Sequence, residues 1–376
     1  MAKHKVMLVH VYAGTQGTAG LYLNETIKAI QETNITQKAF VSYYYPFNNA
    51  KKIFYKYTDL ASGRKKTKIR PYVRYLELLY ALIYIFCNII YIHPQYLNYS
   101  LNSSYLIEYY FLILIRKILK TRIILTCHDI IPFDNNYLDI SKENKRRSYL
   151  FKMADLLLVH NENSKRDLIE YYRVTSDKII YHSFPFMDLS LWNFEVLNKN
   201  IDFLFIGHLR KEKGIDVLLD AWRKFNKKVP SANLYIVGNM PTNSTLNVSE
   251  YKNQNIKFIL NYVNDSNYTK LIASSRCVVL PYLRGTNSGI PSSALSMRSY
   301  LIVSDIPMFQ NNKIIEKDAF FESGNSDSLL EKLLLFNNKN SINDVSELIR
   351  NYKRTFVCEV TNLYNSILKE QENIDL

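Results

Sequence analysis

Short apolar runs alternate with amphipathic stretches along the whole chain. In the first half, the apolar runs that predict strands are residues 5–11, 89–94, 122–129, 154–160 and 177–184. Helical spacing of apolar residues predicts helices around residues 19–31 and 102–119. Residues 78–92 carry no charge, but this stretch is shorter than the ~20 residues that cross a bilayer. We therefore expect a buried helix there, passing into the strand at residues 89–94.

The same alternation restarts after residues 185–200, which show no clear period and predict a linker. In the second half, strands are expected at residues 201–207, 232–239, 256–260, 276–282 and 300–305. Alternating strands and helices are typical of parallel sheets covered on both faces. The pattern predicts an α/β protein with two doubly wound, Rossmann-like domains, residues 1–187 and 198–350, facing a central cleft at the carboxyl ends of their strands. A last helix is expected from residue 343 to about 370, and the end of the chain (about 355–376) is expected to pack back onto the first domain.

The composition fits two packed domains and an anionic partner. Hydrophobic residues are 47% of the 376-residue chain, enough for two cores. Lys and Arg number 48 against 34 Asp and Glu, a formal net charge of +14, which leaves nucleic acid, a membrane surface and a phosphorylated substrate open as partners. The four cysteines are far apart, which disfavours a disulfide framework or a zinc site and favours a reducing cytoplasm. The first apolar run is short, is interrupted by His10 and lacks a cleavage pattern, so we expect a strand and not a signal peptide.

Basic residues and glycines are concentrated in the turn "GHLRKEKG" at residues 207–214, which connects a predicted strand to a predicted helix. The helix after it is predicted by apolar residues at helical spacing: Ile215, Leu218, Leu219, Trp222 and Phe225. A helix N-terminus offers free N–H groups and partial positive charge, and Arg210 and Lys213 add two cations, so the turn suits a phosphate. Gly207 and Gly214 let the backbone approach closely. A solvated surface turn is the competing interpretation.

A second strand end in the same half carries a similar signal. After the strand at residues 276–282, Thr286, Asn287, Ser288 and Gly289 precede a helix for which Ser288 is the expected N-cap. The amides behind this cap would face the same cleft and bind the same anion. A capped surface helix is the alternative.

These motifs resemble the nucleotide-sugar half of GT-B glycosyltransferases of family 4. In that family a strand, the pattern "G-x-L-x-x-x-K-G" and a helix recur in this order, and the residues here are Gly207, Leu209, Lys213 and Gly214. The stretch "NLYIVGN" resembles the family's next strand and glycine, and "SGIPSSALSMRSYLIVSDI" resembles its donor-binding helix and following strand. Because "TCHDIIPF" and "ADLLLVHNENSKRDLIEYYRV" resemble the family's first half, the resemblance covers nearly the whole chain.

The resemblance implies roles for individual residues. Arg210 and Lys213 would hold the donor pyrophosphate, and His128 would line the sugar pocket as the third catalytic residue; a hydrogen-bonded histidine at a strand end is the alternative for His128. Gly14 and Gly17 resemble the acceptor-side loop, and their spacing departs from the G-x-G-x-x-G of a nicotinamide cofactor site. The implied donor-binding residues are Gly207, Gly238, Asn239, Thr286, Asn287, Ser288, Gly289, Ile290 and Ser293.

Two acidic positions of the family are not acidic here. The family usually has two glutamates separated by seven residues, the second of which binds ribose hydroxyls, whereas this chain has Gly285 and Ser293. A hydroxyl donates or accepts where a carboxylate accepts two bonds, so ribose recognition is weaker or is supplied elsewhere. No Asp-x-Asp motif occurs in the sequence, so we expect no metal at the leaving group and no cofactor besides the sugar nucleotide. The resemblance also implies retention at the anomeric carbon.

Basic and tyrosine residues crowd the segment from Lys51 to Arg74. Such a segment could lie on anionic headgroups at the inner face of the cytoplasmic membrane and present the acceptor side to a lipid-linked sugar. If so, salt should release the protein, because exposed charges are screened beyond ~10 Å at 0.1 M. A solvated basic loop is the alternative.

The function that these observations favour is transfer of a sugar from a nucleoside-diphosphate sugar to a glycan or lipid-linked glycan, by a metal-independent hexosyltransferase-type enzyme of surface polysaccharide biosynthesis. A catalytically inactive GT-B-like subunit that binds sugar nucleotides or a partner is the alternative, because both glutamates are replaced. A nucleic-acid-binding protein would explain the charge, but no helix-turn-helix, zinc finger or aromatic RNA-binding motif is visible in the sequence. We therefore expect no nucleic-acid partner.

Overall fold

The computed structural model of the protein describes residues 7–14, 18–45, 47–59, 67–101, 106–128, 130, 140–187, 189, 198–240, 248–251, 254–261, 263–285, 288–338 and 346–372. The chain divides into two units, one formed by Met1–Pro185 with Arg354–Leu376 and the other by Phe186–Lys353. Each unit is built on one parallel sheet with flanking helices, so the α/β fold class expected from the alternating pattern is confirmed.

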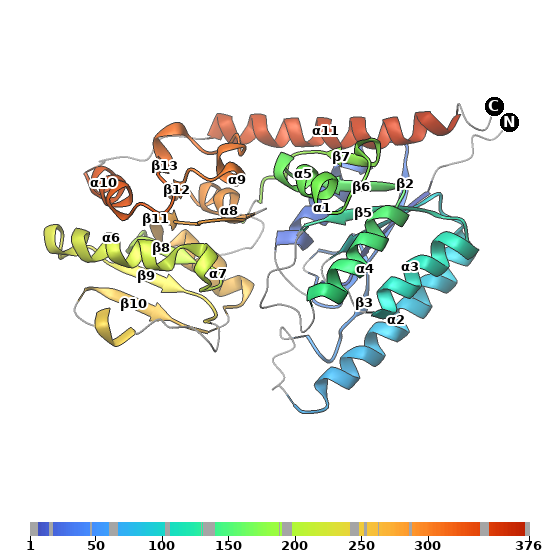
Figure 1. Ribbon diagram of the computed structural model, residues 1–376, viewed down its shortest axis with the longest axis horizontal. Coiled ribbons are helices and arrows are strands. Elements are labelled where there is room, and N and C mark those ends of the chain that lie inside the picture. Colours follow the sequence, from blue (N-terminus) through green and yellow to red (C-terminus); the bar gives the residue numbers. More distant parts are fainter. Residues whose placement is uncertain are drawn as a thin grey trace. The chain divides into compact units, whose positions relative to one another are not determined.

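The first unit contains a seven-stranded sheet in the order β3-β2-β1-β4-β5-β6-β7 (Figure 1). The strands are β1 (Met7–Tyr12), β2 (Thr36–Ser42), β3 (Lys51–Phe54), β4 (Tyr96–Leu101), β5 (Arg122–Cys127), β6 (Leu156–Val159) and β7 (Ile179–Tyr181). The helices are α1 (Thr18–Gln31), α2 (Arg70–Ile92), α3 (Leu106–Ile118), α4 (Ile140–Met153), α5 (Glu162–Glu170) and the single turn η2 (Ser176–Lys178). The strand order reverses at β1, which pairs with β2 on one side and β4 on the other, and in open α/β sheets ligands bind outside the strand ends at such a reversal.

The second unit contains a six-stranded sheet in the order β10-β9-β8-β11-β12-β13. The strands are β8 (Ile201–Ile206), β9 (Leu234–Val237), β10 (Ile256–Ile259), β11 (Ser275–Leu280), β12 (Tyr300–Ser304) and β13 (Phe320–Phe321). The helices are η4 (Lys211–Lys213), α6 (Ile215–Lys228), η5 (Val248–Tyr251), α7 (Asp265–Ala273), α8 (Ile290–Ser296), α9 (Pro307–Gln310), η6 (Lys317–Ala319) and α10 (Ser326–Asn337). Here the order reverses at β8, the strand that leads into the basic turn.

The last helix, α11 (Ser346–Glu372), contributes to both cores. Its first turns place Ile349 and Tyr352 against the core of the second unit. From residue 354 on it belongs to the first unit, where four of its residues are buried with residues from β1, β4, β5 and β6: Phe356, Val360, Tyr364 and Ile367. Burial of these four side chains fixes residues 356–367 of α11 on the first sheet.

The expected strand at residues 89–94 is wrong. Helix α2 continues to Ile92 and ends where His93 adopts a left-handed conformation (φ 49°), and the next strand begins only at Tyr96. Leu78, Leu82, Ile85 and Ile89 are buried on one face of α2, so the isoleucines at the end of the run continue a helical period and do not start a strand. Three further strands in the first unit, β2, β3 and β4, and the short β13 in the second were not predicted.

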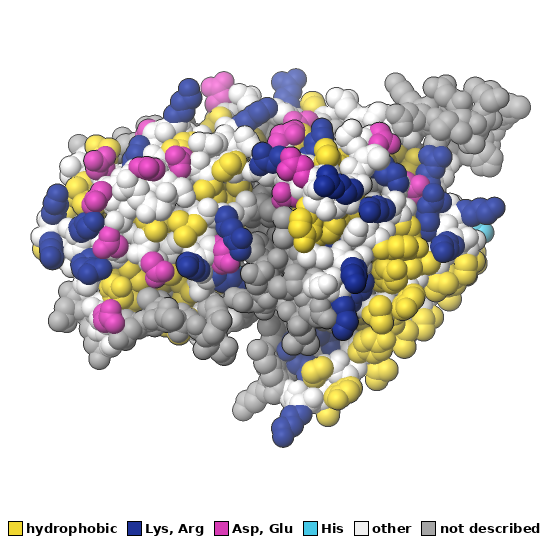
Figure 2. Space-filling model, viewed as in Figure 1, with side chains coloured by type: hydrophobic (Ala, Val, Ile, Leu, Met, Phe, Trp, Pro, Cys, Tyr) yellow, Lys and Arg dark blue, Asp and Glu magenta, His cyan; other side chains and the backbone are white. Residues whose placement is uncertain are grey.

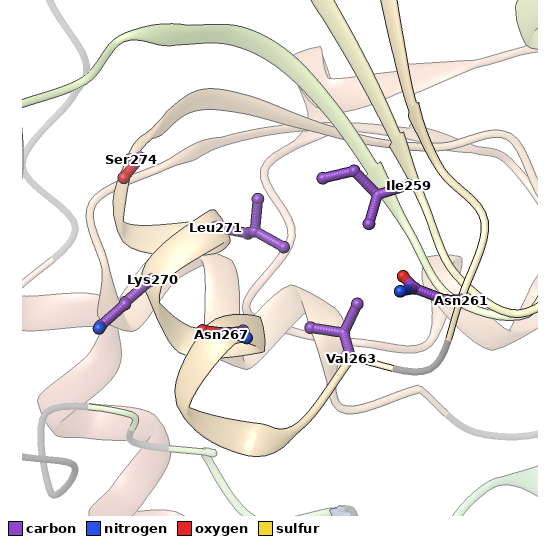
Figure 3. A pocket seen from close by; sticks show the side chains of 7 residues that line it. All are labelled: Ile259, Asn261, Val263, Asn267, Lys270, Leu271 and Ser274. Carbon is purple, nitrogen blue, oxygen red and sulfur yellow. The ribbon is translucent and has the colours of Figure 1, made fainter.

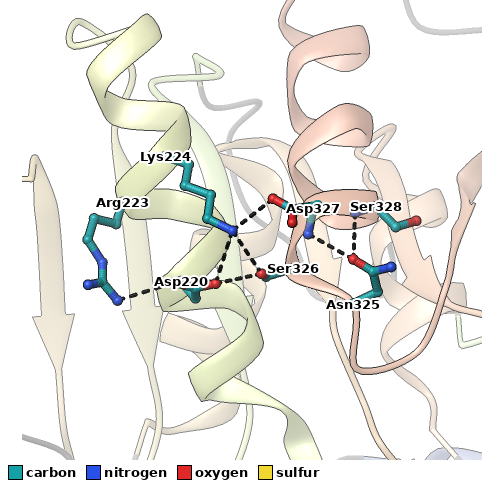
Figure 4. Close-up of polar contacts among 7 residues, drawn as sticks. All are labelled: Asp220, Arg223, Lys224, Asn325, Ser326, Asp327 and Ser328. Atoms are coloured by element: carbon teal, nitrogen blue, oxygen red, sulfur yellow. Dashed lines mark hydrogen bonds and ion pairs between the residues drawn. The ribbon is translucent and has the colours of Figure 1, made fainter.

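Polar side chains hold α6 and α10 side by side (Figure 4). The Lys224 amine lies 3.3 Å from the Asp220 carboxylate and 2.8 Å from that of Asp327, and the Ser326 hydroxyl donates to Asp220 at 2.5 Å. The Asn325 side chain caps α10 by accepting from two backbone N–H groups of its first turn. These contacts fix α6, the helix that follows the basic turn.

Candidate active site

The basic turn follows β8 and is pressed against two neighbouring strand ends. Gly207 and Gly238, directly after β8 and β9, have φ values of 147° and 149°, which L side chains rarely adopt. A Cβ atom on Gly238 would lie 1.7 Å from the Gly207 carbonyl oxygen, so no side chain fits there. The Leu209 N–H also donates to the carbonyl of Asn239 at 3.0 Å, and the Asn239 side chain is exposed. The ends of β8 and β9 are thereby locked together.

Gly214 joins the same turn to the end of β11. Its φ of 65° is left-handed, and a Cβ atom there would lie 1.7 Å from the carbonyl oxygen of Pro281. The N–H groups of Leu283 and Arg284 donate to the carbonyl of Glu212, which ties the loop after β11 to the turn. Glycine is therefore required in this turn, because three strand ends and the start of α6 meet there and leave no room for a side chain.

Lys213 points toward a buried aromatic ring. Its amine lies 3.6 Å from the centre of the Tyr282 ring, and Tyr282 is 1% exposed. Arg210 is half-buried in the same turn, whereas the Lys211 side chain is exposed. Partial burial of the ring, together with the charges of Arg210 and Lys213, lowers the pKa of His208. Arg210 and Lys213 place two cations in this one turn, and their positive potential would favour an anion.

The predicted residues of the second helix start meet this turn. The Ile290 side chain and the Tyr282 hydroxyl lie about 4 Å from the position that a Cβ atom would take on Gly207. The N-cap of α8 is Gly289, one residue later than expected, and Ser288 Oγ accepts from the Ile290 N–H at 3.4 Å. Lys213 and Ser288 thus both contact Tyr282, and the Tyr282 hydroxyl and Ile290 both lie close to Gly207, so the basic turn and the start of α8 are neighbours.

Some of the predicted donor-binding residues do not lie at the surface of this turn, or lie outside the described residues. Ser293 is 1% exposed, and its hydroxyl has no hydrogen-bond partner among the described residues. Gly285, the position of the family's first glutamate, is partly exposed on the loop after β11. Thr286 and Asn287, and Gly17 in the first unit, lie outside the described residues. Gly14 is half-buried directly after β1, at the point where the first sheet reverses its strand order.

A cavity of about 350 Å³ lies elsewhere in the second unit, between the edge strand β10 and α7 (Figure 3). The residues that line it are Ile259, Asn261, Val263, Asn267, Lys270, Leu271 and Ser274. None of the predicted donor residues is among them. The backbone nevertheless connects it to the turn, because the Gly238 N–H donates to the Ile259 carbonyl at 3.0 Å.

Three histidines stand at the carboxyl ends of three neighbouring strands in the first unit. His128 follows β5, His160 follows β6 and His182 follows β7. The rings of His128 and His160 are stacked with centroids 5.3 Å apart, and those of His160 and His182 meet edge to face at 5.1 Å. Tyr22 from α1 contacts all three rings, at 4.6 to 5.6 Å. We call these four side chains the histidine cluster.

Burial keeps the deeper histidines neutral. Burial lowers the pKa of His182 to about 4, and it lowers the pKa of His160 well below the ordinary value of 6.5. His182 Nδ1 lies 3.0 Å from the Ser183 carbonyl, so it carries the proton, and His182 Nε2 accepts from the Tyr22 hydroxyl at 2.8 Å. No group of three or more potential ligands is placed to hold a metal among the residues described. His128, which is only partly buried, thus packs against rings that are themselves buried.

Solved structures with the same fold span nearly the whole chain. Sucrose-phosphate synthase from Thermosynechococcus elongatus aligns with a TM-score of 0.67 at 11% identity, over 99% of this chain and 100% of that one. HepE from Anabaena, in complex with UDP, aligns with a TM-score of 0.60 at 11% identity, over 97% and 100%. A glycosyltransferase from Rickettsia africae aligns with a TM-score of 0.59 at 15% identity, over 98% of each chain. At such identities the likeness establishes the fold, which is GT-B.

A family model matches the second half of the chain. Residues 192–355 match the model of the glycosyl transferases group 1 family, and this range contains the whole basic turn and α8. The chain has the GT-B fold, and its second unit is similar to the glycosyl transferases group 1 family. A search of curated protein sequences found no match.

Sequence reasoning missed four residues that lie at or against the strand ends: Tyr22, His160, His182 and Tyr282. The signal for the two histidines was present, since each directly follows an apolar run, as His128 does. Tyr22 and Tyr282 gave no such signal, because their positions depend on how α1 and the loop after β11 fold back.

Proposed function

We propose that this protein is a glycosyltransferase that moves a hexose from a nucleoside-diphosphate sugar to a hydroxyl of a glycan or lipid-linked glycan, with retention, in cytoplasmic assembly of surface polysaccharide. The observation that carries the proposal is the Lys213 amine held above Tyr282 in a turn where three strand ends converge. The neighbours whose structures contain UDP or a UDP-sugar, such as HepE and the pneumococcal O-GlcNAc transferase GtfA, support a nucleotide-sugar donor.

The chemistry required of the turn is stabilisation of a leaving group. The bond between the anomeric carbon and the diphosphate oxygen breaks, the acceptor oxygen bonds to that carbon, and the acceptor proton passes to a base or water. Negative charge grows on the departing diphosphate. Arg210, Lys213 and the helix start at Ser288 are proposed to stabilise it as fixed charges and dipoles, which need no reorganisation during the reaction. No metal or organic cofactor is part of this proposal.

Turnover of a sugar nucleotide tests the proposal. A thermal-shift panel of nucleoside diphosphates comes first, because a ligand at 100 times its dissociation constant stabilises the protein by ~2.7 kcal/mol. Product formation from the selected sugar nucleotide should then continue in excess chelator. Binding without transfer to any glycan acceptor would favour the inactive subunit, which the enclosed Ser293 hydroxyl and the missing glutamates suggest. Activity lost in chelator and restored by magnesium or manganese would contradict the metal-free mechanism.

His128→Ala is expected to separate binding from transfer. We propose that His128 contacts the sugar and not the phosphates, so the variant should keep its affinity for the bare nucleoside diphosphate while kcat with the sugar nucleotide falls. Calorimetry with the diphosphate and initial rates with the sugar nucleotide measure the two effects. An equal loss of both would indicate that His128 only supports the fold of the histidine cluster.

A further inference from the structure

The outward face of α2 is apolar where a helix of a water-soluble unit normally exposes polar residues. Tyr72, Leu76, Tyr80, Ile83 and Tyr91 recur at helical spacing and are exposed, Tyr72 to 74% and Tyr91 to 89%. Together with their neighbours they form a stripe along the helix. Exposed apolar side chains on an ordinary protein surface are scattered singly, whereas a contiguous stripe of them marks an interaction site.

Helix α3 extends this surface. It packs beside α2, and Leu106, Tyr110, Leu114 and Ile118 are exposed at intervals of four residues. Figure 2 shows the hydrophobic side chains in the region of these two helices as a broad band. We call these nine exposed side chains of α2 and α3 the apolar band.

The opposite face of α2 anchors it in the first unit. Leu78, Leu82, Ile85 and Ile89 are buried in the core with the strands. By length and composition α2 is one helix of the described chain that could cross a membrane, but a soluble protein's core helix passes the same test. If α2 left the unit to cross a bilayer, the strand residues that these four side chains cover would be exposed to water, so α2 is suited to lie on a membrane surface and not to span the membrane.

Exposed lysines flank the apolar band. Lys68 precedes α2, and Lys117 and Lys120 lie at the end of α3; all three are exposed. The two helices have one carboxylate each, and both are engaged: Glu77 accepts from the Tyr57 N–H, and the buried Glu108 accepts from the Tyr99 hydroxyl. The band therefore shows cations at its margins and no carboxylate aimed outward from α2 or α3.

A cationic cavity opens at the start of α2. It has a volume of about 400 Å³, and Arg70 and Arg74 line it with Tyr75. The Arg70 guanidinium donates to the Thr58 carbonyl at 2.7 and 2.9 Å, and that of Arg74 lies 3.6 Å from the centre of the Tyr55 ring. These contacts hold two guanidinium groups in place at the end of the band, where they favour an anionic group such as a phosphate.

We propose that the apolar band docks on an anionic lipid bilayer, with α2 and α3 lying in the headgroup region. Tyrosines on a face with cationic margins suit the boundary between lipid tails and headgroups, where an aromatic body is buried and a hydroxyl stays wet. The inference does not depend on the proposed reaction. It changes the expected membrane contact, because Lys51 to Phe54 of the basic segment form strand β3 of the sheet, and apolar contact replaces charge as the main attraction.

Vesicle binding by a paired variant tests this directly. Ile83→Gln with Leu114→Gln should lower the affinity for phosphatidylcholine–phosphatidylglycerol vesicles at least tenfold, because each buried aliphatic side chain is worth roughly a factor of ten. Leu335→Gln is the matched control: Leu335 is 62% exposed on α10 in the second unit, and this variant should bind like the wild type. Part of the wild-type binding should persist at about 1 M salt, where exposed charges are screened within ~3 Å.

The protein's own cysteines report the orientation. Cys87 is exposed on the same face of α2, four residues after Ile83, and Cys358 is exposed on α11, while Cys127 and Cys277 are buried. An environment-sensitive fluorophore on Cys87 of a Cys358→Ser variant should shift to the blue with these vesicles, whereas one on Cys358 of a Cys87→Ser variant should not. Absence of vesicle binding, equal binding by the paired variant, or full release by salt would overturn the proposal. Self-association abolished by the paired variant without any vesicle binding would instead assign the band to a second copy of the chain.

Discussion

Lys213→Ala is expected to weaken nucleoside-diphosphate binding by about 2 to 5 kcal/mol, the cost of removing one partner from a desolvated charge pair. The amine lies over the buried Tyr282 ring at the point where three strand ends meet, so its charge acts in a fixed position beside the proposed diphosphate. Transfer should fall at least as far as binding, because negative charge on the diphosphate grows as the sugar bond breaks. Calorimetric titration and initial rates measure the two effects.

Lys211→Ala is the matched control for that variant. Lys211 stands two residues earlier in the same turn, and its side chain is exposed. Because exposed charges are screened, its removal should change affinity by less than ~1 kcal/mol. Equally mild effects of the two substitutions would mean that the turn is a solvated surface feature, and the phosphate site proposed for it would have to be abandoned.

The basic turn was predictable because steric crowding allows only glycine at some of its positions. Gly214 and Gly238 each occupy a position where a Cβ atom would overlap a backbone oxygen, so only glycine satisfies the fold. The following helix was predictable for a similar reason: its apolar positions repeat at helical spacing, and all five expected core residues of α6 are buried, Ile215, Leu218, Leu219, Trp222 and Phe225. Local patterns specify local structure when a single interaction decides each position.

Strand β4 escaped prediction because its stabilising contacts are polar and distant in sequence. Asn98 is buried in the centre of the first sheet, where its amide donates to the Tyr364 hydroxyl and lies 3.3 Å from His10 Nδ1. The Thr126 hydroxyl donates to the other end of the Asn98 side chain at 2.8 Å. A buried polar network of this kind is formed by β1, β4, β5 and α11 together, so the strand's own composition reads as a loop.

The exposure of one face of α2 was not predicted, because the local sequence looks the same on the buried and the exposed face. Residues 78–92 carry no charge and are apolar except for Asn88, a composition that normally indicates a helix buried on all sides. Periodicity cannot separate a face that packs against a sheet from a face that meets another apolar medium. Only the fold shows that Leu82 is buried while Tyr80 and Ile83 are exposed.

Acidification from pH 6.5 to pH 4 is expected to destabilise the fold by several kcal/mol. Burial lowers the pKa of both His10 and His182 to about 4, against an ordinary value of 6.5 that applies to the unfolded chain. Above pH 6.5 both forms of the chain carry these imidazoles neutral, and the full stability is present. As the pH falls toward 4, these histidines bind protons in the unfolded chain but not in the folded chain. The free energy of unfolding therefore falls by about 3 kcal/mol for each of the two residues. His160 acts in the same direction, and the total is comparable with the 5 to 15 kcal/mol that stabilises a typical domain.

His10→Gln isolates one of these contributions. Glutamine can keep hydrogen bonds to Gln37 and Asn98 but binds no proton, so the slope of unfolding free energy against pH should fall by about 1.4 kcal/mol per pH unit between pH 4 and 6.5. Urea unfolding at several pH values measures the slope. His93→Asn is the control, because His93 is exposed at the left-handed end of α2, a backbone conformation that asparagine accepts. Carboxylates also lose favourable contacts in acid, but their contribution is common to the wild type and both variants. Identical slopes for the wild type and His10→Gln would show that His10 binds its proton as readily in the folded as in the unfolded chain, and the neutral polar network around Asn98 would then be the wrong description of this sheet.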